Sequence, residues 1–184
     1  LVGDKHLAES KSVVEKEPSM IEIENSITSP ERFNSYEHDE NGIAIEDSET
    51  TKKNFDRRMK VSKEIAKEAE KFEMIKIHGN KNSKNIIIGW GSTKGVILDA
   101  IHGGDIDAKF MQVLYLEPFS EKIKEELKKA SKILIVESNS TAQLAHLIAR
   151  KTGIMIEDKN KILRYDGRAF FSDELAEEIK RRIK

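Results

Sequence analysis

Short apolar runs alternate with amphipathic segments from residue 74 to the carboxy terminus, and this alternation constrains the fold more than any other feature. The runs at 85–89 (NIIIG), 110–116 and 132–136 are each followed by a segment with helical spacing. Strands that are apolar on both faces are typical of a sheet covered on both sides. Repeated strand–helix units therefore predict an α/β fold, with a mainly parallel sheet, right-handed crossovers and helices on both faces.

Capping residues indicate where the helices begin and end. Ser120 can cap one helix and Gly153 can stop the next, since these residue types favour those positions. A last helix opens at Ser172, where two acidic residues follow. The other expected elements are, in chain order, an edge strand at 74–78, helices at 93–101, 120–130 and 141–152, and a strand at 162–165.

A second segment with helical spacing precedes the sheet. Beginning at Ser48, apolar or small residues recur every three or four positions between Lys, Arg and Glu, which predicts an amphipathic helix of about six turns. Its apolar stripe must pack against another surface. The stripe consists of Phe55, Met59, Ser62, Ile65, Ala66, Ala69 and Phe72.

The amino-terminal part of the chain differs from the rest in charge. Residues 1–50 hold 4 Lys/Arg and 13 Asp/Glu, although the whole chain has a net charge of only -1. Residues 1–48 show no sustained periodicity and too few large apolar side chains to fold alone. We therefore expect an irregular acidic connector at 1–48, a linker helix at 49–73 and an α/β domain at 74–184.

Composition excludes several functions. The chain has no Cys, so it cannot itself build a disulfide framework or a cysteine-ligated iron–sulfur cluster. No apolar run approaches the roughly 20 residues of a membrane helix, and we expect a soluble cytoplasmic protein. The basic residues at 180–184 suit the carboxy terminus of a helix and lack interleaved aromatics, so we expect no nucleic-acid binding.

A glycine-rich loop, Gly89-Trp90-Gly91-Ser92-Thr93-Lys94-Gly95, lies between an expected strand and helix. Gly91, Ser92, Thr93 and Lys94 are candidates for holding an anion such as a nucleotide or coenzyme A, because backbone N–H groups converge at a helix start. However, the spacing GxGxxxG matches neither the dinucleotide fingerprint nor the P-loop. Close packing of strand against helix is the favoured explanation.

Two further segments concentrate polar residues. The loop that contains His38 and Asp39 carries several oxygen and imidazole groups, but its spacing is not that of a calcium loop. A solvated or interface loop is favoured over a metal site. The segment 137–143 (ESNSTAQ) ends a strand and opens a helix, where Ser140 or Thr141 is expected as the N-cap. The His residues show no paired spacing, and His102 and His146 are expected on helices. No catalytic set emerges.

Read in order, four segments carry a family resemblance. They are WGSTKGVILDA, LYLEPF, VESNSTAQLAHLIARKTG and YDGRAF. Together they resemble the second domain of the alpha subunits of 2-oxoacid:ferredoxin oxidoreductases. The positions that match are Gly91, Ser92, Thr93, Pro118, Phe119, Glu137, Asn139, Gln143, Tyr165, Asp166, Gly167, Arg168 and Phe170.

The resemblance extends upstream and has exceptions. Residues 4–10 look like the segment that leaves the family's first domain, and 37–47 look like its Glu-His-Asp-Glu connector. Ala142 replaces a usual Gly, Ala169 a usual Pro and Ser138 a common Asn. The 137–143 segment is more like the 2-oxoglutarate or broad 2-oxoacid branch than the pyruvate branch.

The resemblance implies a transketolase C-terminal-like scaffolding domain that is inactive alone. Such enzymes use thiamine pyrophosphate with Mg and iron–sulfur clusters, deliver an acyl group to coenzyme A and reduce ferredoxin; none of these cofactors is expected on this chain alone. The expected partners are a beta-type subunit and, where present, gamma- and delta-type subunits or domains. The expected interface residues are Glu137, Asn139, Gln143, Asp166, Arg168, His38 and Asp39, with 91–94 also facing other domains.

Overall fold

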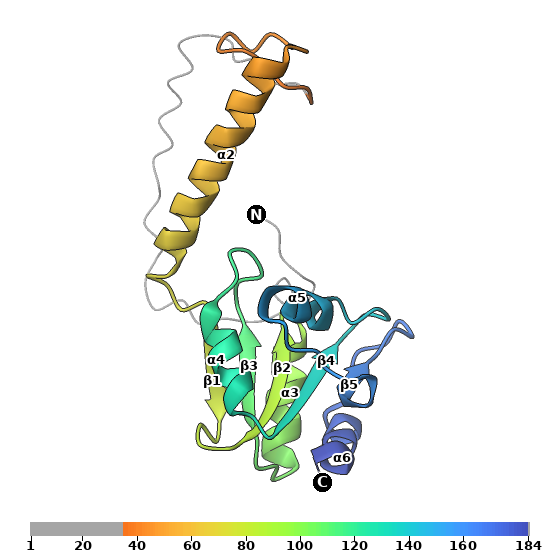
Figure 1. The fold of residues 1–184 in the computed structure, drawn as a ribbon. Helices are drawn as coiled ribbons and strands as arrows, with labels where there is room; N and C mark the ends of the chain where they lie inside the picture. Colours follow the sequence, from red (N-terminus) through yellow and green to blue (C-terminus); the bar gives the residue numbers. More distant parts are fainter. Residues whose placement is uncertain (1–34, 184) are drawn as a thin grey trace, which may run out of the picture. The chain divides into compact units, whose positions relative to one another are not determined.

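The computed structural model describes residues 35–183, which fall into two compact units (Figure 1). Among these residues, one unit extends to Glu68 and the other begins at Ala69. Most of the connector expected at 1–48, together with the family-like segment 4–10, lies outside the described residues. The division expected at 48 and 73 stays a prediction.

One long helix, α2 (Ser48–Ala69), has 22 residues, and all but the last of them belong to the first unit. The carboxylate of Asp47 caps it, accepting hydrogen bonds from the backbone N–H of Glu49 (3.0 Å) and of Thr50 (2.9 Å). Hydrogen bonding to the Thr50 side chain is the largest cause that holds the pKa of Asp47 below its ordinary value, and the two backbone N–H groups lower it further. Satisfying the free N–H groups at a helix start is what fixes that start.

A short hairpin-like turn precedes α2, in a stretch where no regular structure is expected from the sequence. The backbone of His38 pairs with that of Ala44 in an antiparallel bridge. Within the turn, the Asp39 carboxylate accepts hydrogen bonds from the N–H groups of Asn41 and Ile43, both at 2.9 Å. A short Asp side chain can close a turn in this way without help from strand periodicity.

The second unit is an α/β domain built on a five-stranded sheet in the order β1-β3-β2-β4-β5. Strand β1 pairs with β3 in antiparallel fashion, and all other pairs are parallel. The α/β class and the edge position of the first strand are therefore confirmed. The elements are β1 (Ile75–Gly79), β2 (Asn85–Trp90), α3 (Thr93–Gly103), β3 (Lys109–Val113), α4 (Glu121–Lys129), β4 (Lys132–Glu137), α5 (Gln143–Thr152), the 3-10 helix η1 (Asp158–Asn160), β5 (Lys161–Leu163) and α6 (Ser172–Ile183).

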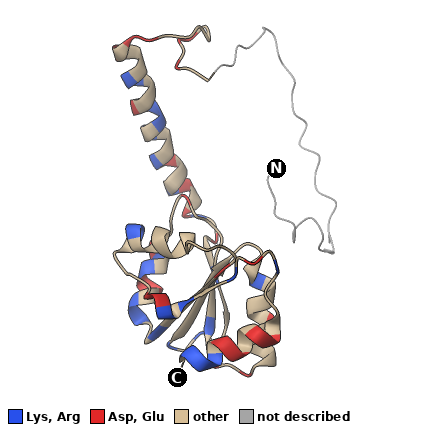
Figure 2. Ribbon diagram, turned by 90° about the vertical axis from the view of Figure 1, so that its right-hand side faces the viewer, with Lys and Arg blue, Asp and Glu red and all other residues tan. Residues whose placement is uncertain are grey.

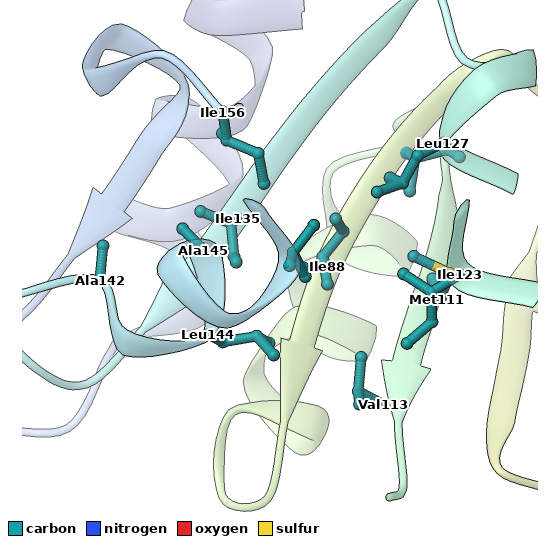
Figure 3. Close-up of a cluster of buried hydrophobic side chains, with 12 residues drawn as sticks. Ile88, Met111, Val113, Ile123, Leu127, Ile135, Ala142, Leu144, Ala145 and Ile156 are labelled. Carbon is teal, nitrogen blue, oxygen red and sulfur yellow. The ribbon is translucent and has the colours of Figure 1, made fainter. Parts of the chain in front are cut away.

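The helices cover both faces of the sheet, as the fully apolar strands predict. Alternate residues of the central strands point to opposite faces, so that Ile88 packs with α4 and α5 while Ile87 packs with α3 and α6. Figure 3 shows the first of these clusters, where Ile123 of α4 and Leu144 of α5 approach the strands from the same side. Burial on two faces, at about 1.5–3 kcal/mol for each large side chain, stabilises the domain.

One charged pair lies partly inside the domain, at the start of β3. Lys109 is only 5% exposed, and its ammonium donates a hydrogen bond to the Glu126 carboxylate of α4 at 2.6 Å. A second cation, Lys129, donates to the other oxygen of Glu126 at 2.9 Å. The two contacts lower the pKa of Glu126, with Lys109 the larger cause.

Over residues 35–183, none of the helices combines the length and the apolar character needed to span a bilayer.

Candidate functional site

The carboxyl edge of the sheet, beside β2 and β4, is the candidate site. These two strands are neighbours, with Ile88 level with Ile135. The chain leaves β2 for α3 on one face and leaves β4 for α5 on the other. In open α/β sheets, this divergence of connections is where functional groups gather. The fold thus brings together two segments singled out in the sequence, 91–94 and 137–143.

Glu137, the last residue of β4, is buried and bound to the start of α5. The residue is only 1% exposed. Oxygen Oε2 accepts a hydrogen bond from the backbone N–H of Leu144 at 2.8 Å, and Oε1 accepts one from Ala145 at 3.1 Å. A carboxylate at a helix start satisfies free N–H groups and complements the helix dipole.

Asn139 completes this arrangement with both ends of its amide. Its Nδ2 donates to Glu137 Oε2 at 2.8 Å. Its Oδ1 accepts from the N–H groups of Thr141 at 3.1 Å and of Gln143 at 3.3 Å. Together, the two side chains fix the loop between β4 and α5 in one conformation.

The expected N-cap of α5 is wrong. The helix begins at Gln143, and the residue in the N-cap position is Ala142, rather than Ser140 or Thr141. Ala142 lies in the left-handed region, with φ 50° and ψ 54°. The carboxylate of Glu137, which arrives from the strand, has taken over the capping role. A positive φ also explains why glycine suits this position.

The glycine-rich loop is explained by packing and by its own hydrogen bonds. A Cβ on Gly89 would lie 2.5 Å from Ile97 Cδ1 and 2.7 Å from Thr93 Oγ1. The Thr93 hydroxyl donates to the carbonyl of Trp90 at 2.9 Å and accepts from its N–H at 3.2 Å. A side chain at this position would displace Ile97 or Thr93, so glycine suits the close approach of α3 to β2, as the packing explanation predicts. None of these contacts favours a bound nucleotide or coenzyme A.

Large apolar side chains are exposed along the same edge. Trp90 ends β2, Leu114 follows β3 and Tyr165 lies just beyond β5, and they are 37%, 42% and 70% exposed. The strand register places them near one level of the sheet. Trp90 pairs with Val113, the residue before Leu114, and Glu137 pairs with Leu163, two residues before Tyr165. The sequence did not single out Trp90 and Leu114 as interface residues. The only indication was a large apolar residue at the end of a strand, and core residues show the same pattern.

The turn after β5 places Asp166 and Arg168 at this edge as well. Asp166 Oδ1 accepts a hydrogen bond from the N–H of Arg168 at 3.1 Å, and both residues are exposed. Arg164, which the sequence did not single out, organises the turn. Its guanidinium donates to the carbonyl of Ala169 at 2.7 Å and lies over the ring of Phe170 at 5.3 Å.

The remaining two predicted interface residues, His38 and Asp39, belong to the unit that contains α2. Both Asp39 hydrogen bonds are internal to their turn and lower the pKa of that carboxyl, the bond from Ile43 most. Among residues 35–183, no three His, Asp or Glu side chains group closely enough to ligate a metal ion. His102 and His146 lie on α3 and α5, as expected.

Comparison with known proteins finds alpha subunits of one kind of enzyme. No protein-family model matches the chain. The alpha subunit of 2-oxoacid:ferredoxin oxidoreductase 1 from Sulfurisphaera tokodaii is 35% identical over 149 residues, or 80% of this chain and 23% of that subunit. The alpha subunit of the enzyme from Saccharolobus solfataricus is 35% identical over 148 residues, again 23% of its length. The chain thus spans about a quarter of the curated relatives it matches.

A solved structure agrees in fold. The 2-oxoglutarate:ferredoxin oxidoreductase from Magnetococcus marinus, solved with 2-oxoglutarate, coenzyme A and succinyl-CoA bound, superposes with a TM-score of 0.67. The match covers 88% of this chain and 28% of that chain at 20% identity, so it supports the fold alone. The sequence relatives carry the assignment: over four fifths of its length, this chain is homologous to the alpha subunits of 2-oxoacid:ferredoxin oxidoreductases.

Proposed function

We propose that this chain supplies the interface domain of an alpha-type subunit in a thiamine-diphosphate-dependent 2-oxoacid:ferredoxin oxidoreductase. In such an enzyme, a 2-oxoacid is decarboxylated, its acyl group passes to coenzyme A, and ferredoxin takes the electrons. The domain's own role is to hold subunits together through the carboxyl edge of the sheet. Homology to alpha subunits supports the family, and the surface of that edge supports the role.

The observation that supports this interface role is the exposed apolar row Trp90, Leu114 and Tyr165. The row shares the carboxyl edge with the loop between β4 and α5, which is held by its own hydrogen bonds. Aromatic residues are enriched at protein interfaces, where they bury large areas at low entropic cost. The loop exposes Ser138, Ser140 and Thr141, while Glu137 holds its backbone. An apolar centre with a polar and preorganised rim is the composition expected of a docking surface.

We assign the catalytic steps to other parts of the assembly. The chain has no Cys to ligate an iron–sulfur cluster, and it spans only about a quarter of the alpha subunits that it resembles. We therefore assign the cofactor, its metal and the iron–sulfur clusters to other domains or subunits, with a beta-type subunit as the main partner. The chain alone should have no activity.

The choice of substrate is a finer part of the proposal. The Glu137, Asn139 and Gln143 set resembles the 2-oxoglutarate or broad 2-oxoacid branch. In this fold, the side chains of Glu137 and Asn139 form hydrogen bonds at the start of α5, and Gln143 contributes its backbone N–H there. Reduction of ferredoxin by the complete enzyme, measured with 2-oxoglutarate, pyruvate and 2-oxobutyrate, would decide between the branches.

The test of the interface uses the complete alpha-type subunit that contains this sequence, produced together with its beta-type subunit. Trp90→Glu and Tyr165→Glu should each weaken assembly at least about tenfold, because they place a charge in the centre of an apolar contact. Met155→Glu is the matched control. Met155 is 83% exposed, but it lies between α5 and η1, in the segment that leads into β5 and not in one that leaves the carboxyl end of a strand.

Size-exclusion chromatography and a titration by light scattering would measure assembly, and circular dichroism would confirm that each variant is folded. Unchanged assembly of both edge variants would contradict the interface role. Equal losses from the edge variants and from Met155→Glu would point to a general effect of added charge instead.

A further inference from the structure

The sequence contains one Asn-Gly pair, Asn41-Gly42, and it lies in the turn before α2. Asn41 is exposed, and Gly42 adopts a φ of 73°. Glycine has no Cβ, so its backbone nitrogen can approach a neighbouring group more closely than that of any other residue. When the turn opens, this nitrogen can therefore reach the side-chain amide of the residue before it.

We propose that Asn41 is a site of deamidation, at which the backbone nitrogen of Gly42 attacks the side-chain carbonyl carbon Cγ of Asn41. A bond forms between that nitrogen and Cγ, and the bond from Cγ to Nδ2 breaks. Ammonia leaves and carries the proton that the Gly42 nitrogen loses. Water then opens the succinimide ring at either of its carbonyl carbons, which yields aspartate or isoaspartate. Water is the only reactant besides the chain, so the reaction needs no cofactor and no oxidant.

Hydrogen bonds of the turn control how often the two groups meet. The N–H of Gly42 donates to the carbonyl of Asp39 at 3.1 Å, and this bond must break before the nitrogen can attack. The Asp39 carboxylate accepts hydrogen bonds from the N–H groups of Asn41 and Ile43, both at 2.9 Å. These two bonds are exposed to solvent, and local opening of such a turn costs much less than global unfolding.

Among residues 35–183, two other asparagines precede a small residue, and both pairs are held more firmly. Asn139, which precedes Ser140, donates through Nδ2 to Glu137 and accepts two backbone N–H groups at Oδ1. Asn82 precedes Ser83, which is only 6% exposed and whose hydroxyl donates to a backbone carbonyl at 3.1 Å. A fixed amide or a buried attacking residue hinders ring closure, so Asn41 should react first.

Deamidation would add charge to a segment that is already acidic. Residues 35–47 hold five Asp and Glu and no Lys or Arg, and Figure 2 shows the acidic residues in red. Hydrogen bonding from Ile43 is the largest cause that lowers the pKa of Asp39, and the backbone and side chain of Asn41 lower it further. A carboxylate at position 41 exchanges a donor for a like charge, so it should raise that pKa and weaken the turn. NMR titration of Asn41→Asp would measure the rise, and an unchanged pKa would contradict this effect.

The test uses the complete subunit that contains this sequence, incubated at mildly alkaline pH in water labelled with oxygen-18. Mass spectrometry of its peptides would locate each deamidated residue and separate isoaspartate from aspartate. We expect one labelled oxygen and both products at position 41, formed at least about tenfold faster than at Asn139. Asn41→Gln should abolish the signal, because the longer side chain would have to close a larger ring.

A second variant tests the control by the turn. Asp39→Ala removes the carboxylate that accepts the N–H groups of Asn41 and Ile43, so the turn should open more often. Deamidation of Asn41 should then be roughly tenfold faster, since hydrogen bonds to a charged acceptor are among the stronger ones. Glu40→Ala is the matched control. It removes a charge from the same turn but none of these hydrogen bonds, and it should have little effect on the rate.

Three outcomes would overturn the proposal. They are deamidation at position 41 no faster than at Asn139, aspartate there without isoaspartate, and an unchanged rate in Asp39→Ala. Circular dichroism would verify that each variant is folded. Because both reacting groups belong to adjacent residues of one chain, the result does not depend on the proposed function, and either can fail without the other.

Discussion

The carboxylate of Glu137 at the end of β4 accepts a hydrogen bond from the backbone N–H of Leu144, seven residues later, at 2.8 Å. The bond joins the last residue of a buried strand to the first turn of the helix that follows it. Because Ala145 donates to the other carboxylate oxygen, both oxygens are used at the helix start. This contact fixes the path of the loop between β4 and α5, which is exposed at the carboxyl edge.

Replacing Glu137 tests this contact directly. Glu137→Gln exchanges one acceptor oxygen for an amide group that donates, so a buried N–H of α5 loses its partner. We expect a loss of about 2–3 kcal/mol in the free energy of unfolding, measured by urea titration, since hydrogen bonds to a buried charged group are among the stronger ones. Glu121→Gln, in the exposed first turn of α4, is the control. A loss below about 0.5 kcal/mol would show that the carboxylate is not needed.

Two glycines of the same loop should respond in opposite directions. Gly89→Ala places a methyl group 2.5 Å from Ile97 Cδ1, and we expect a loss of about 1–3 kcal/mol in the free energy of unfolding. Gly95→Ala lies within α3 with nothing near its Cβ, so a gain of about 0.5–1 kcal/mol follows from helix propensity. Thermal unfolding of both variants would measure the changes. Equal effects would contradict the packing explanation of Gly89.

Stability should fall in acid partly through Glu126. Its pKa is lowered in the folded state, first by Lys109 and then by Lys129, relative to an unfolded value near 4.5. The contribution is therefore present above that unfolded pKa and is lost as the pH falls through the lower folded pKa. Urea titrations from pH 7 to pH 3 should show a shallower decline for Glu126→Gln than for the unchanged protein. Parallel curves would exclude this carboxyl as a source of acid sensitivity.

The turn before α2 offers a test that does not depend on global stability. Hydrogen bonding to Arg58 is the largest cause that lowers the pKa of Glu37. In Arg58→Gln, the pKa of Glu37 should rise toward its ordinary value, which NMR titration of the carboxyl carbon would record. The Asp39 pKa, lowered by its own turn, should change little. A Glu37 pKa that stays low in the variant would assign the shift to another group.

Much of the fold follows from local pattern. The apolar runs that become β2 and β4 predict a sheet covered on both faces. Gly153 marks the end of α5, where it occupies the C-cap position in a left-handed conformation. Ser120 likewise occupies the N-cap position of α4, although its side chain makes no capping hydrogen bond there. Each of these features needs only neighbouring residues, because apolar periodicity and capping act within one or two turns. The strand order did not follow in this way.

The candidate site shows the limit of local pattern. Ser140 and Thr141 have good capping chemistry for α5, yet Glu137 took that role because the strand ends with its carboxylate facing the free N–H groups of the helix. Trp90 and Leu114 resemble core residues in sequence, and only the strand register leaves them exposed on one edge.

The sequence by itself determined the α/β class, the order of the elements, the absence of cysteine ligands and the resemblance to an oxidoreductase family. The tertiary structure decided which buried carboxylate caps α5, what packs against Gly89 and which large apolar side chains are exposed at the carboxyl edge of the sheet. The reason is physical: periodicity and capping are fixed within a segment, whereas register, close approach and exposure depend on contacts between segments far apart in the chain.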